Sequence, residues 1–522
     1  MIEIAAAGAL QRVLEVVIQA SPTILVGLMV AAIIRHLMGP DRTRWLFSGP
    51  YGIGLLKAWL VGMLLPVCSL GVLPVVREMR RARVSAGSTL TFALTAPLFN
   101  PISVLYGLTM ADPVVLLSFC LGSLLVVTVL GSLWERLMPV AAMSELDAPA
   151  TGEGETTVVG TVEGIPHGWR RILGMAVLSA RESVGPMLGY AAVTLVGVAV
   201  ATVLLPHGVL QTRAEHDDLF APAFMALVAV PLYAAPMTVM MQLASMFQHG
   251  NSIGAAFSLL VLGAGLNLGL MIWLLRNHPP GRTAICLASL VLLTISVAYA
   301  FDRPLYDSGV ESAGHTHAFD GYCNPFVEGH TDPWTQIGRN LSDAIRPDEI
   351  VGGILLACFI LFGAVLAIVD RRGRLERALA RAPAKSRRSW DVELPEWVLG
   401  SVAIVALILA SLFGCYLYYP PKQTILAEMR MVHAEVFSAA NSGDWDTALY
   451  WIPIYDDWSR KLMVSEYLRG NSVSEYRRAK SEVLLEHLER LEHDVEDQRS
   501  AACQARVRKL NAAFLRFRRA FE

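Results

Sequence analysis

The chain has 522 residues, of which 54% are hydrophobic and only 17% are charged. Soluble proteins carry about 25% charged residues, so this composition indicates a membrane protein whose partner is the lipid bilayer. The net charge of −2 gives no field that would attract nucleic acid. The seven cysteines form no CxxC pair, so neither a zinc ribbon nor a disulfide framework is indicated, and we expect no cofactor.

Uncharged runs of about 20 residues, which is the length that crosses a bilayer, recur along the chain. They are 16–34, 58–76, 84–111, 113–134, 183–206, 283–301, 350–369 and 397–419, and the run 219–275 must hold at least two crossings. Proline disrupts helices, so Pro66 and Pro74 should break the second run and 97–101 the third. We predict an all-α, polytopic membrane protein of two related halves with broken or re-entrant helices and a helical C-terminal tail.

The order of these runs predicts six regions. They are a first permease half (1–138), a flexible linker rich in Pro, Gly, Thr and Glu (139–170), a second permease half (171–302), an extracytoplasmic loop (303–349), two additional transmembrane helices joined by a basic cytoplasmic loop (350–419), and a helical tail (420–522). The dense Arg and Lys cluster of 371–388 should stay in the cytoplasm, which puts the 303–349 loop and the tail outside it. We expect a multi-pass protein of the plasma (inner) membrane.

The stretch from Pro66 to Pro101 carries the clearest sign of function. Cys68, Ser69, Pro97 and Asn100 lie among helix breakers inside apolar sequence. In lipid, the freed backbone groups need protein or a water-filled cavity around them, and transport sites are built from such discontinuous helices. The alternative is two kinked helices that bind nothing.

A second copy favours the transport site. With a shift of 167 residues, four positions align: Ser85 with Ser252, Gly87 with Gly254, Ala96 with Gly263, and Asn100 with Asn267. Broken segments at corresponding places in two halves indicate a transporter binding site. We therefore expect Cys68, Ser69, Pro97, Asn100, Pro236 and Asn267 to bind the substrate.

Four arginines, Arg77, Arg80, Arg81 and Arg83, follow the first broken segment. They fit either a solvated cytoplasmic turn or a vestibule that attracts anions.

A resemblance to a known family is carried by residues 68–74 (CSLGVLP), the basic turn and residues 96–101 (APLFNP). Over roughly residues 10–300, the chain resembles the ArsP/YraQ-type predicted permeases. That family carries a Cys-Ser-Cys-Gly-Val-Ile-Pro-like segment, a basic turn and an Ala-Pro-x-x-Asn-Pro-like segment, with a looser second copy. The resemblance implies an inner-membrane permease, and some members export trivalent organoarsenicals or metal ions.

This sequence departs from the family pattern at its thiols. The second motif cysteine is Leu70, and the cysteine of the second copy is Ala235 or Pro236. Because a thiophilic cargo requires two or three thiolates, the transport role carries over better than an arsenical substrate does. Cys68 could also be a small buried hydrophobic residue, and Asn100 could simply cap a half-helix.

The loop 303–349 contains His315, His317, Cys323 and His330, which are ligand types for zinc or copper. Their spacing matches no fixed metal motif, so capture of a metal at the outer mouth is one interpretation and a plain polar loop is the other.

An enzyme is not indicated, because HExxH, GxSxG and an intramembrane pair of Asp, Glu or Lys are all missing from the sequence. We expect a permease, exporting a small solute that could be a metal(loid) or organometalloid, by alternating access. The alternative is a membrane scaffold or sensor that does not transport.

The tail has Leu484, Leu488, Leu491 and Val495 at helical spacing. This pattern predicts an amphipathic helix, in a hairpin that packs on itself or in a module that makes a homo-oligomer or recruits a protein partner.

Overall fold

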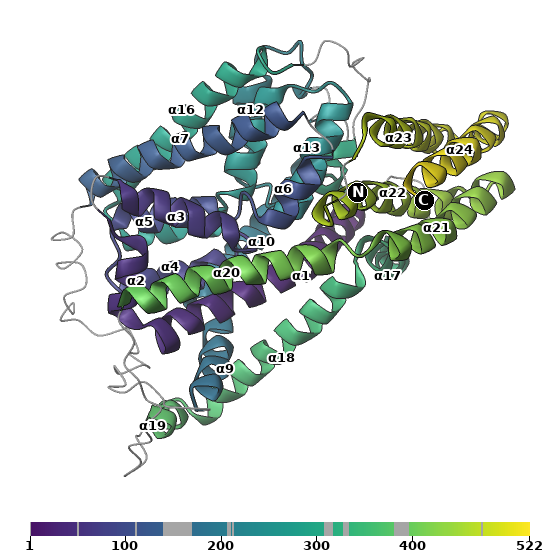
Figure 1. Ribbon diagram of the computed structural model, residues 1–522. Coiled ribbons are helices and arrows are strands. Elements are labelled where there is room, and N and C mark those ends of the chain that lie inside the picture. The colour runs from purple at the N-terminus through teal and green to yellow at the C-terminus, as the bar shows by residue number, and fades with distance from the viewer. Residues whose placement is uncertain are drawn as a thin grey trace. The chain divides into compact units, whose positions relative to one another are not determined.

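The structure is a computed structural model that describes residues 2–49, 52–109, 112–138, 170–205, 210, 213–306, 317–326, 333–380, 396–470 and 473–522 (Figure 1). Within these ranges the regular structure is helical, apart from an isolated bridge between Glu215 and Asn251. The prediction of an all-α fold is confirmed. The chain forms two compact units, one of Met1–Ser103 and Ala111–Ile408, the other of Val104–Met110 and Leu409–Glu522.

Six helical stretches among the described residues are long and apolar enough to cross a membrane. They are Ile2–Phe47, Pro113–Leu137, Pro186–Leu204, Pro280–Asp302, Asp348–Val369 and Gly400–Ser442. The pair Ile253–Ala264 and Leu268–Asn277, bent by 58°, would add a seventh crossing. The chain is therefore a multi-pass membrane protein, as its composition predicted.

The first part of the chain alternates long and short helices. It contains α1 (Ile2–Ile33), the π-helix η1 (Ile34–Met38), α2 (Gly39–Phe47), α3 (Ile53–Leu64), α4 (Val72–Arg81), α5 (Ala86–Thr95), α6 (Pro101–Gly107) and α7 (Pro113–Leu137). The prediction that Pro74 breaks a helix is wrong, because Pro74 lies in the first turn of α4, where the missing amide has no helical partner to lose.

The second part repeats this alternation. It contains α9 (Arg170–Ser183), α10 (Pro186–Leu204), α12 (Ala221–Ala229), α13 (Pro236–Gln248), α14 (Ile253–Ser258), the π-helix η2 (Leu259–Ala264), α15 (Leu268–Asn277) and α16 (Pro280–Asp302). Nearly all of the expected linker, 139–170, lies outside the described residues.

Five further helices lie between the second part and the tail in the described part of the chain. They are the 3-10 helix η3 (His317–Tyr322), α17 (Pro333–Ala344), α18 (Pro347–Val369), α19 (Arg374–Ala380) and α20 (Glu396–Tyr418). The sequence predicted a plain loop over 303–349, whereas the structure forms η3 and α17 there.

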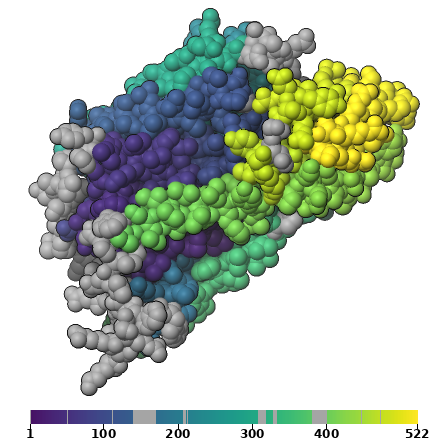
Figure 2. All heavy atoms as spheres, viewed as in Figure 1, coloured from purple at the N-terminus to yellow at the C-terminus, as the bar shows by residue number. Residues whose placement is uncertain are grey.

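The exposed side chains of α18 are mostly apolar, as expected for a helix that faces lipid. Figure 2 shows the atoms of the chain as spheres, coloured by residue number. The exposed side chains of α18 include Val351, Ile354, Leu361 and Val365. In water such a stripe would be an aggregation hazard, so the bilayer is the medium that makes this surface stable.

The tail forms four helices with their own core: α21 (Lys422–Ser442), α22 (Trp445–Leu468), α23 (Glu475–Glu496) and α24 (Ser500–Phe521). The predicted stripe is buried in that core, at Leu484, Leu488, Leu491 and Val495. Each helix packs on the next and α24 packs on α21, so the tail is a four-helix bundle rather than a simple hairpin.

Shortening a core side chain should open this bundle. Leu488→Ala removes methyl groups from a position that is 1% exposed, which costs about 2–5 kcal/mol. We expect maleimide to reach the buried Cys503 thiol much faster in this variant of the full-length protein. Leu515→Ala is the control, since Leu515 is 40% exposed and its truncation should leave Cys503 protected. Equal protection of Cys503 in both variants would contradict this packing.

Candidate functional site

Four breaks interrupt the helices of the first unit. Residues 65–71 separate α3 from α4, 96–100 separate α5 from α6, 230–235 separate α12 from α13, and 265–267 separate η2 from α15. The predicted substrate-binding residues all lie in or directly beside these breaks, and all are buried: Cys68, Ser69, Pro97, Asn100, Pro236 and Asn267.

The first and third breaks meet. Cys68 and Leu70 pack with Tyr233 of the third break in one buried cluster, to which α1 contributes Ala20 and α10 contributes Val198. Although the Cys68 thiol is a close neighbour of the Tyr233 hydroxyl, the pair lacks the geometry of a hydrogen bond. The structure thus brings Cys68 beside a tyrosine that the sequence reasoning did not single out.

The second and fourth breaks also adjoin. A Cβ added to Gly265 would lie 2.9 Å from Leu98 Cδ2, so the two backbones approach closely there. Each break ends in an asparagine that caps the following helix. The Oδ1 atom of Asn100 accepts from the Ser103 amide at 2.8 Å, and that of Asn267 accepts from the Leu270 amide at 2.7 Å. The capping interpretation of Asn100 therefore has a direct contact, and a role for Asn100 in solute binding stays a prediction.

The long helix α10 runs beside both pairs of breaks. Its Val198 belongs to the Cys68 cluster, while its Thr194 hydroxyl donates to Asn267 Oδ1 at 3.0 Å. Its Gly197 allows a close approach, because a Cβ there would lie 2.4 Å from Leu268 Cδ1. The α10 helix thereby links the two meeting points into one region.

On the other side, α1 lies directly against the first break. A Cβ on Gly27 would lie 2.0 Å from the Gly71 carbonyl oxygen, and one on Gly71 would lie 2.7 Å from the Thr23 carbonyl oxygen. This contact is backbone on backbone, so both positions must remain glycine for α1 to stay in place.

Three polar atoms in this region are buried and have no hydrogen-bond partner among the described residues: Ser69 Oγ, Tyr233 Oη and Asn267 Nδ2. Leaving such a group unsatisfied costs about 1–3 kcal/mol, and folded proteins normally avoid it. Atoms of this kind, together with the Cys68 thiol, can bind a small polar solute or a soft ion by hydrogen bonds and one sulfur ligand.

Contacts around the breaks recur after 167 residues. The Gly87 amide donates to Glu135 Oε2 at 2.7 Å, and the Gly254 amide donates to Asp302 Oδ1 at 2.9 Å. Ser85 caps α5 as Ser252 caps α14, and α7 begins at Pro113 as α16 begins at Pro280. Two backbone hydrogen bonds recur as well. The amide of Leu65 donates to the Gly62 carbonyl oxygen as Leu232 does to Ala229, and the amide of Val72 donates to the Cys68 carbonyl oxygen as Val239 does to Ala235.

Charged and amide side chains gather where α1, α4, α9, α15 and α18 end, and we call this end of the unit the basic face. Its contacts include Arg35 with Glu78, Arg77 with Glu182, Arg80 with Asn277, and Arg181 with Asp370. Lys57 of α3 donates to the Ser48 carbonyl oxygen, and Arg44 to that of Ala82, so the α3–α4 pair begins and ends at this face. This pair is a re-entrant hairpin.

The α12–α13 pair opens at the other end of the unit, which we call the opposite face. Gly254, at the start of α14, lies against Pro222 at the start of α12. Gln242 of α13 accepts a hydrogen bond from Tyr322 of η3 at 2.7 Å. The two re-entrant hairpins therefore come from opposite faces, and their breaks meet at Cys68 and Tyr233.

The arginines after the first break are not simply solvated. Arg77 pairs with the buried Glu182 at 2.7 Å, and Arg81 pairs with the buried Glu78. Glu15, which directly precedes the uncharged run 16–34, is also buried on α1 and pairs with Arg12 at 2.7 Å. Pairing with a cation allows a carboxylate to be buried.

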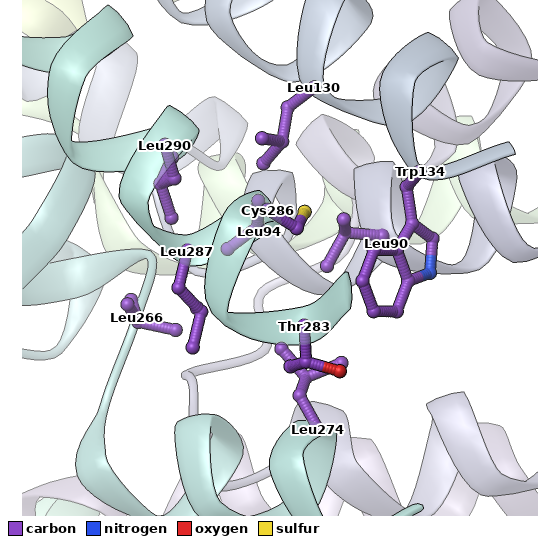
Figure 3. Close-up of a pocket in the computed structure, with 10 residues that line it drawn as sticks. All are labelled: Leu90, Leu94, Leu130, Trp134, Leu266, Leu274, Thr283, Cys286, Leu287 and Leu290. Atoms are coloured by element: carbon purple, nitrogen blue, oxygen red, sulfur yellow. The ribbon is translucent and has the colours of Figure 1, made fainter. Parts of the chain in front are cut away.

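Figure 3 shows a small cavity between α5, α7, α15 and α16. Apolar side chains line it, among them Leu94, Leu130 and Leu290, with Cys286 and Thr283 as its polar members. A neighbouring hollow is lined by Arg80, Thr89, Trp134 and His278. Leu266 of the fourth break lines the first cavity, but neither lining includes Cys68 or Tyr233, so these cavities are separate from the place where the first and third breaks meet.

Most of the predicted metal ligands are not described. His315 and His330 lie outside the described residues, as does the side chain of His317, and the Cys323 thiol is buried. The carbonyl oxygen of Cys323 accepts from Arg12 Nε at 3.1 Å. The metal site therefore stays a prediction.

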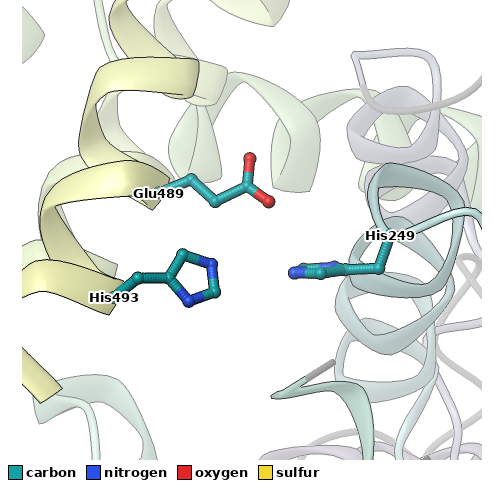
Figure 4. Close-up of side chains that lie close together, drawn as sticks. All are labelled: His249, Glu489 and His493. Atoms are coloured by element: carbon teal, nitrogen blue, oxygen red, sulfur yellow. The ribbon is translucent and has the colours of Figure 1, made fainter. Parts of the chain in front are cut away.

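Figure 4 shows three further side chains of interest for proton or metal chemistry. In the first unit, His249 follows α13 and its Nδ1 atom lies 2.7 Å from the Ser245 carbonyl oxygen. In the second unit, Glu489 and His493 lie one turn apart on α23. We assign no site to them.

The family described as predicted permease, ArsP_1, matches residues 5–302. The matched region contains all four breaks and both hairpins. The chain belongs to this family. The resemblance read from the CSLGVLP and APLFNP segments is thereby confirmed, and membership supports a membrane permease or transporter rather than an enzyme.

Two relatives share a shorter segment with this permease. The UPF0718 protein YcgR of Bacillus subtilis is 30% identical over 89 residues, and a putative two-component membrane permease complex subunit of Streptococcus mutans is 31% identical over 90 residues. Each match covers 17% of this chain and 30% of the relative. No solved structure matches the chain.

Sequence reasoning missed several residues of this region. Tyr233 could have been noticed, since it is the one side chain with a hydroxyl in the third break. Thr194 and Glu182 gave no such signal, because nothing in the sequence relates them to Asn267 or Arg77. The pairs of Glu135 with Gly87 and Asp302 with Gly254 could have been suspected from the 167-residue shift.

The close approach at Gly27 generates a stability prediction. Gly27→Ala forces α1 away from the first break, and overpacking of this kind costs about 1–3 kcal/mol. We expect a lower melting temperature in detergent. Gly189→Ala on α10 is the matched control, because open space surrounds that position and alanine favours the helix by about 1 kcal/mol. If Gly27→Ala melts like the wild type, the backbone contact with Gly71 is wrong.

Proposed function

We propose that this permease moves a small solute across the membrane by alternating access, through a site at the Cys68–Tyr233 meeting point. The observation that carries the proposal is the set of buried, unpartnered polar atoms at the breaks: Ser69 Oγ, Tyr233 Oη and Asn267 Nδ2. Atoms of this kind also occur elsewhere, for example Ser481 Oγ in the tail, so the support comes from their gathering at the breaks together with the Cys68 thiol.

The arrangement of the two hairpins supports this mechanism. We propose that the two parts of the matched region are related halves in inverted orientation, with equivalent contacts such as Gly87 with Glu135 and Gly254 with Asp302. In transporters of this design the halves rock around a central site near the bilayer midplane. Cys68, Asn100 and Asn267 would form the pivot of that motion.

The chemistry of the region favours a polar solute or a singly coordinated soft ion. The region offers the thiol of Cys68, the hydroxyls of Ser69 and Tyr233 and the side-chain amides of Asn100 and Asn267. A trivalent arsenical would instead take two or three thiolates. A metal(loid) or organometalloid cargo, with export as its direction, rests on the resemblance alone. Capture of a metal by the loop 303–349 would require the predicted ligands to converge.

We also propose that the protein lies in the plasma (inner) membrane, with the basic face in the cytoplasm, because the Arg and Lys cluster of 371–388 should stay there. A relative is called a subunit of a two-component membrane permease complex. A protein partner or a second copy bound through the tail is the corresponding proposal for this chain.

The second candidate is a scaffold or sensor that has lost transport. Its support is the tight closure around Cys68, since Leu70 and Met240 are buried and the described cavities lie elsewhere. A transporter in an occluded state has the same closure, and the unpartnered hydroxyls favour transport.

The test uses Ser69→Ala and Tyr233→Phe, which delete the unpartnered hydroxyls. Removing an unsatisfied buried group leaves stability unchanged or raises it. We expect unchanged melting but about fivefold weaker transport for each variant, because a hydrogen bond to the cargo contributes about 1 kcal/mol. The measurement is whole-cell resistance and uptake against arsenicals, zinc, copper and small anions.

Two comparisons make this test specific. Tyr299→Phe is the matched control. That hydroxyl lies near the C-terminal end of α16 and donates to the Leu219 carbonyl oxygen, so it is not one of the unpartnered groups. Cys68→Ser separates a thiol-binding cargo from one held by hydrogen bonds. Suppose that the wild type changes the uptake of a solute or the resistance to it. If Ser69→Ala and Tyr233→Phe then transport this solute like the wild type, the proposed site is wrong. If the wild type changes neither quantity for any solute tested, the scaffold function gains support.

A further inference from the structure

We propose that Glu182 forms a charged gate with the arginines of α4, and that this gate controls access to Cys68 from the basic face. The proposal rests on the proposed transport function, because a gate has meaning only within a transport cycle. It adds the residues that would open and close one side of the site.

The gate contacts join the two parts of the matched region. Glu182 of α9 accepts from Arg77 Nη1 at 2.7 Å, and its other oxygen lies 3.8 Å from Arg81 Nη1. Glu182 is only 8% exposed, so its charge depends on these partners. These two contacts would have to break if the first hairpin moved relative to α9.

The first hairpin connects the gate to the site through one rigid helix. The α4 helix begins at Val72, four residues after Cys68, and carries Arg77 and Arg81 at its other end. The Gly71 amide donates to Cys68 Sγ at 3.4 Å and the Val72 amide to the Cys68 carbonyl oxygen at 2.9 Å. A displacement of the arginines would therefore move the backbone that holds the thiol.

The Glu182 side of the gate is anchored. The adjacent Arg181 pairs with Asp370 and with Glu376, each at 3.0 Å, which ties α9 to α18 and α19. Burial would raise the pKa of Asp370, but amide hydrogen bonds from Leu375 and Arg374 and the Arg181 guanidinium hold it below its ordinary value. Asp370 thus keeps its charge, and α9 stays in place when α4 moves.

Arg81 keeps a carboxylate when the gate opens, since Glu78 lies one turn before it on α4. Arg35 of η1 also lies near Glu78, with its Nη1 atom 3.9 Å from Glu78 Oε1. Opening would therefore expose Glu182 and Arg77 to water without leaving a buried charge unpaired. On the opposite face, the contact between Tyr322 of η3 and Gln242 of α13 is a neutral hydrogen bond.

The experiment measures how fast N-ethylmaleimide alkylates Cys68 in the full-length protein in membranes, with each cysteine resolved by mass spectrometry. Cys68 is fully buried in the structure. We expect Glu182→Gln and Arg77→Glu each to raise its alkylation rate at least tenfold. The exchanged pair, Arg77→Glu with Glu182→Arg, should restore protection, which a merely structural role of either residue would not predict.

Cys286 is the internal control, because it is buried in α16 against side chains of α5, α7 and α15 rather than of α4 or α9, and it should stay protected. If Cys68 is as protected in both single variants as in the wild type, the gate is wrong. If a variant also exposes Cys286, its fold is lost, and Arg77→Gln then decides. This variant removes the charge that pairs with Glu182 but keeps a polar side chain, and unchanged protection of Cys68 in it overturns the proposal. The assay needs no cargo, so it fails independently of the transport test.

Discussion

The structure of the first unit depends on one constraint: backbone groups inside a bilayer must find partners within the protein. Four breaks free amides and carbonyls inside this apolar unit, and local contacts satisfy several of them. The Val72 amide returns to the Cys68 carbonyl oxygen, and the Asn100 and Asn267 side chains accept the first amides of α6 and α15. The glycines at these places permit close approach of the backbones that surround the breaks.

Because the breaks must be enclosed, they collect at one place. Long helices α1 and α10 pack against them through Gly27 and Gly197, where a side chain would collide with backbone or with Leu268. The enclosed space contains polar side chains that the local backbone does not use. That surplus of hydrogen-bonding capacity, rather than the breaks themselves, gives the argument for a binding site.

Charged side chains at the ends of the unit also need partners within the protein where they are buried. The carboxylates of Glu78 and Glu182 are buried only because arginines accompany them, so each acidic group has become part of a contact between helices. On α9 the pairing of Arg181 with Asp370 and Glu376 holds one partner of such a contact, while α4, which carries the other, follows the break at 65–71. In the proposed gate, the same ion pairs would both stabilise the closed state and separate when the gate opens.

The sequence by itself determined the class and most of the long spans, because lipid demands long uncharged runs. Proline marked several of the breaks, although Pro74 lies inside α4. The sequence also indicated Cys68, Ser69, Asn100 and Asn267, since polar residues in such runs are rare. Only the tertiary structure decided which breaks meet, that Tyr233 lies beside Cys68, and that Glu182 reaches Arg77 from a helix more than 100 residues away. Contacts between distant helices depend on packing, for which a single sequence carries no local signal.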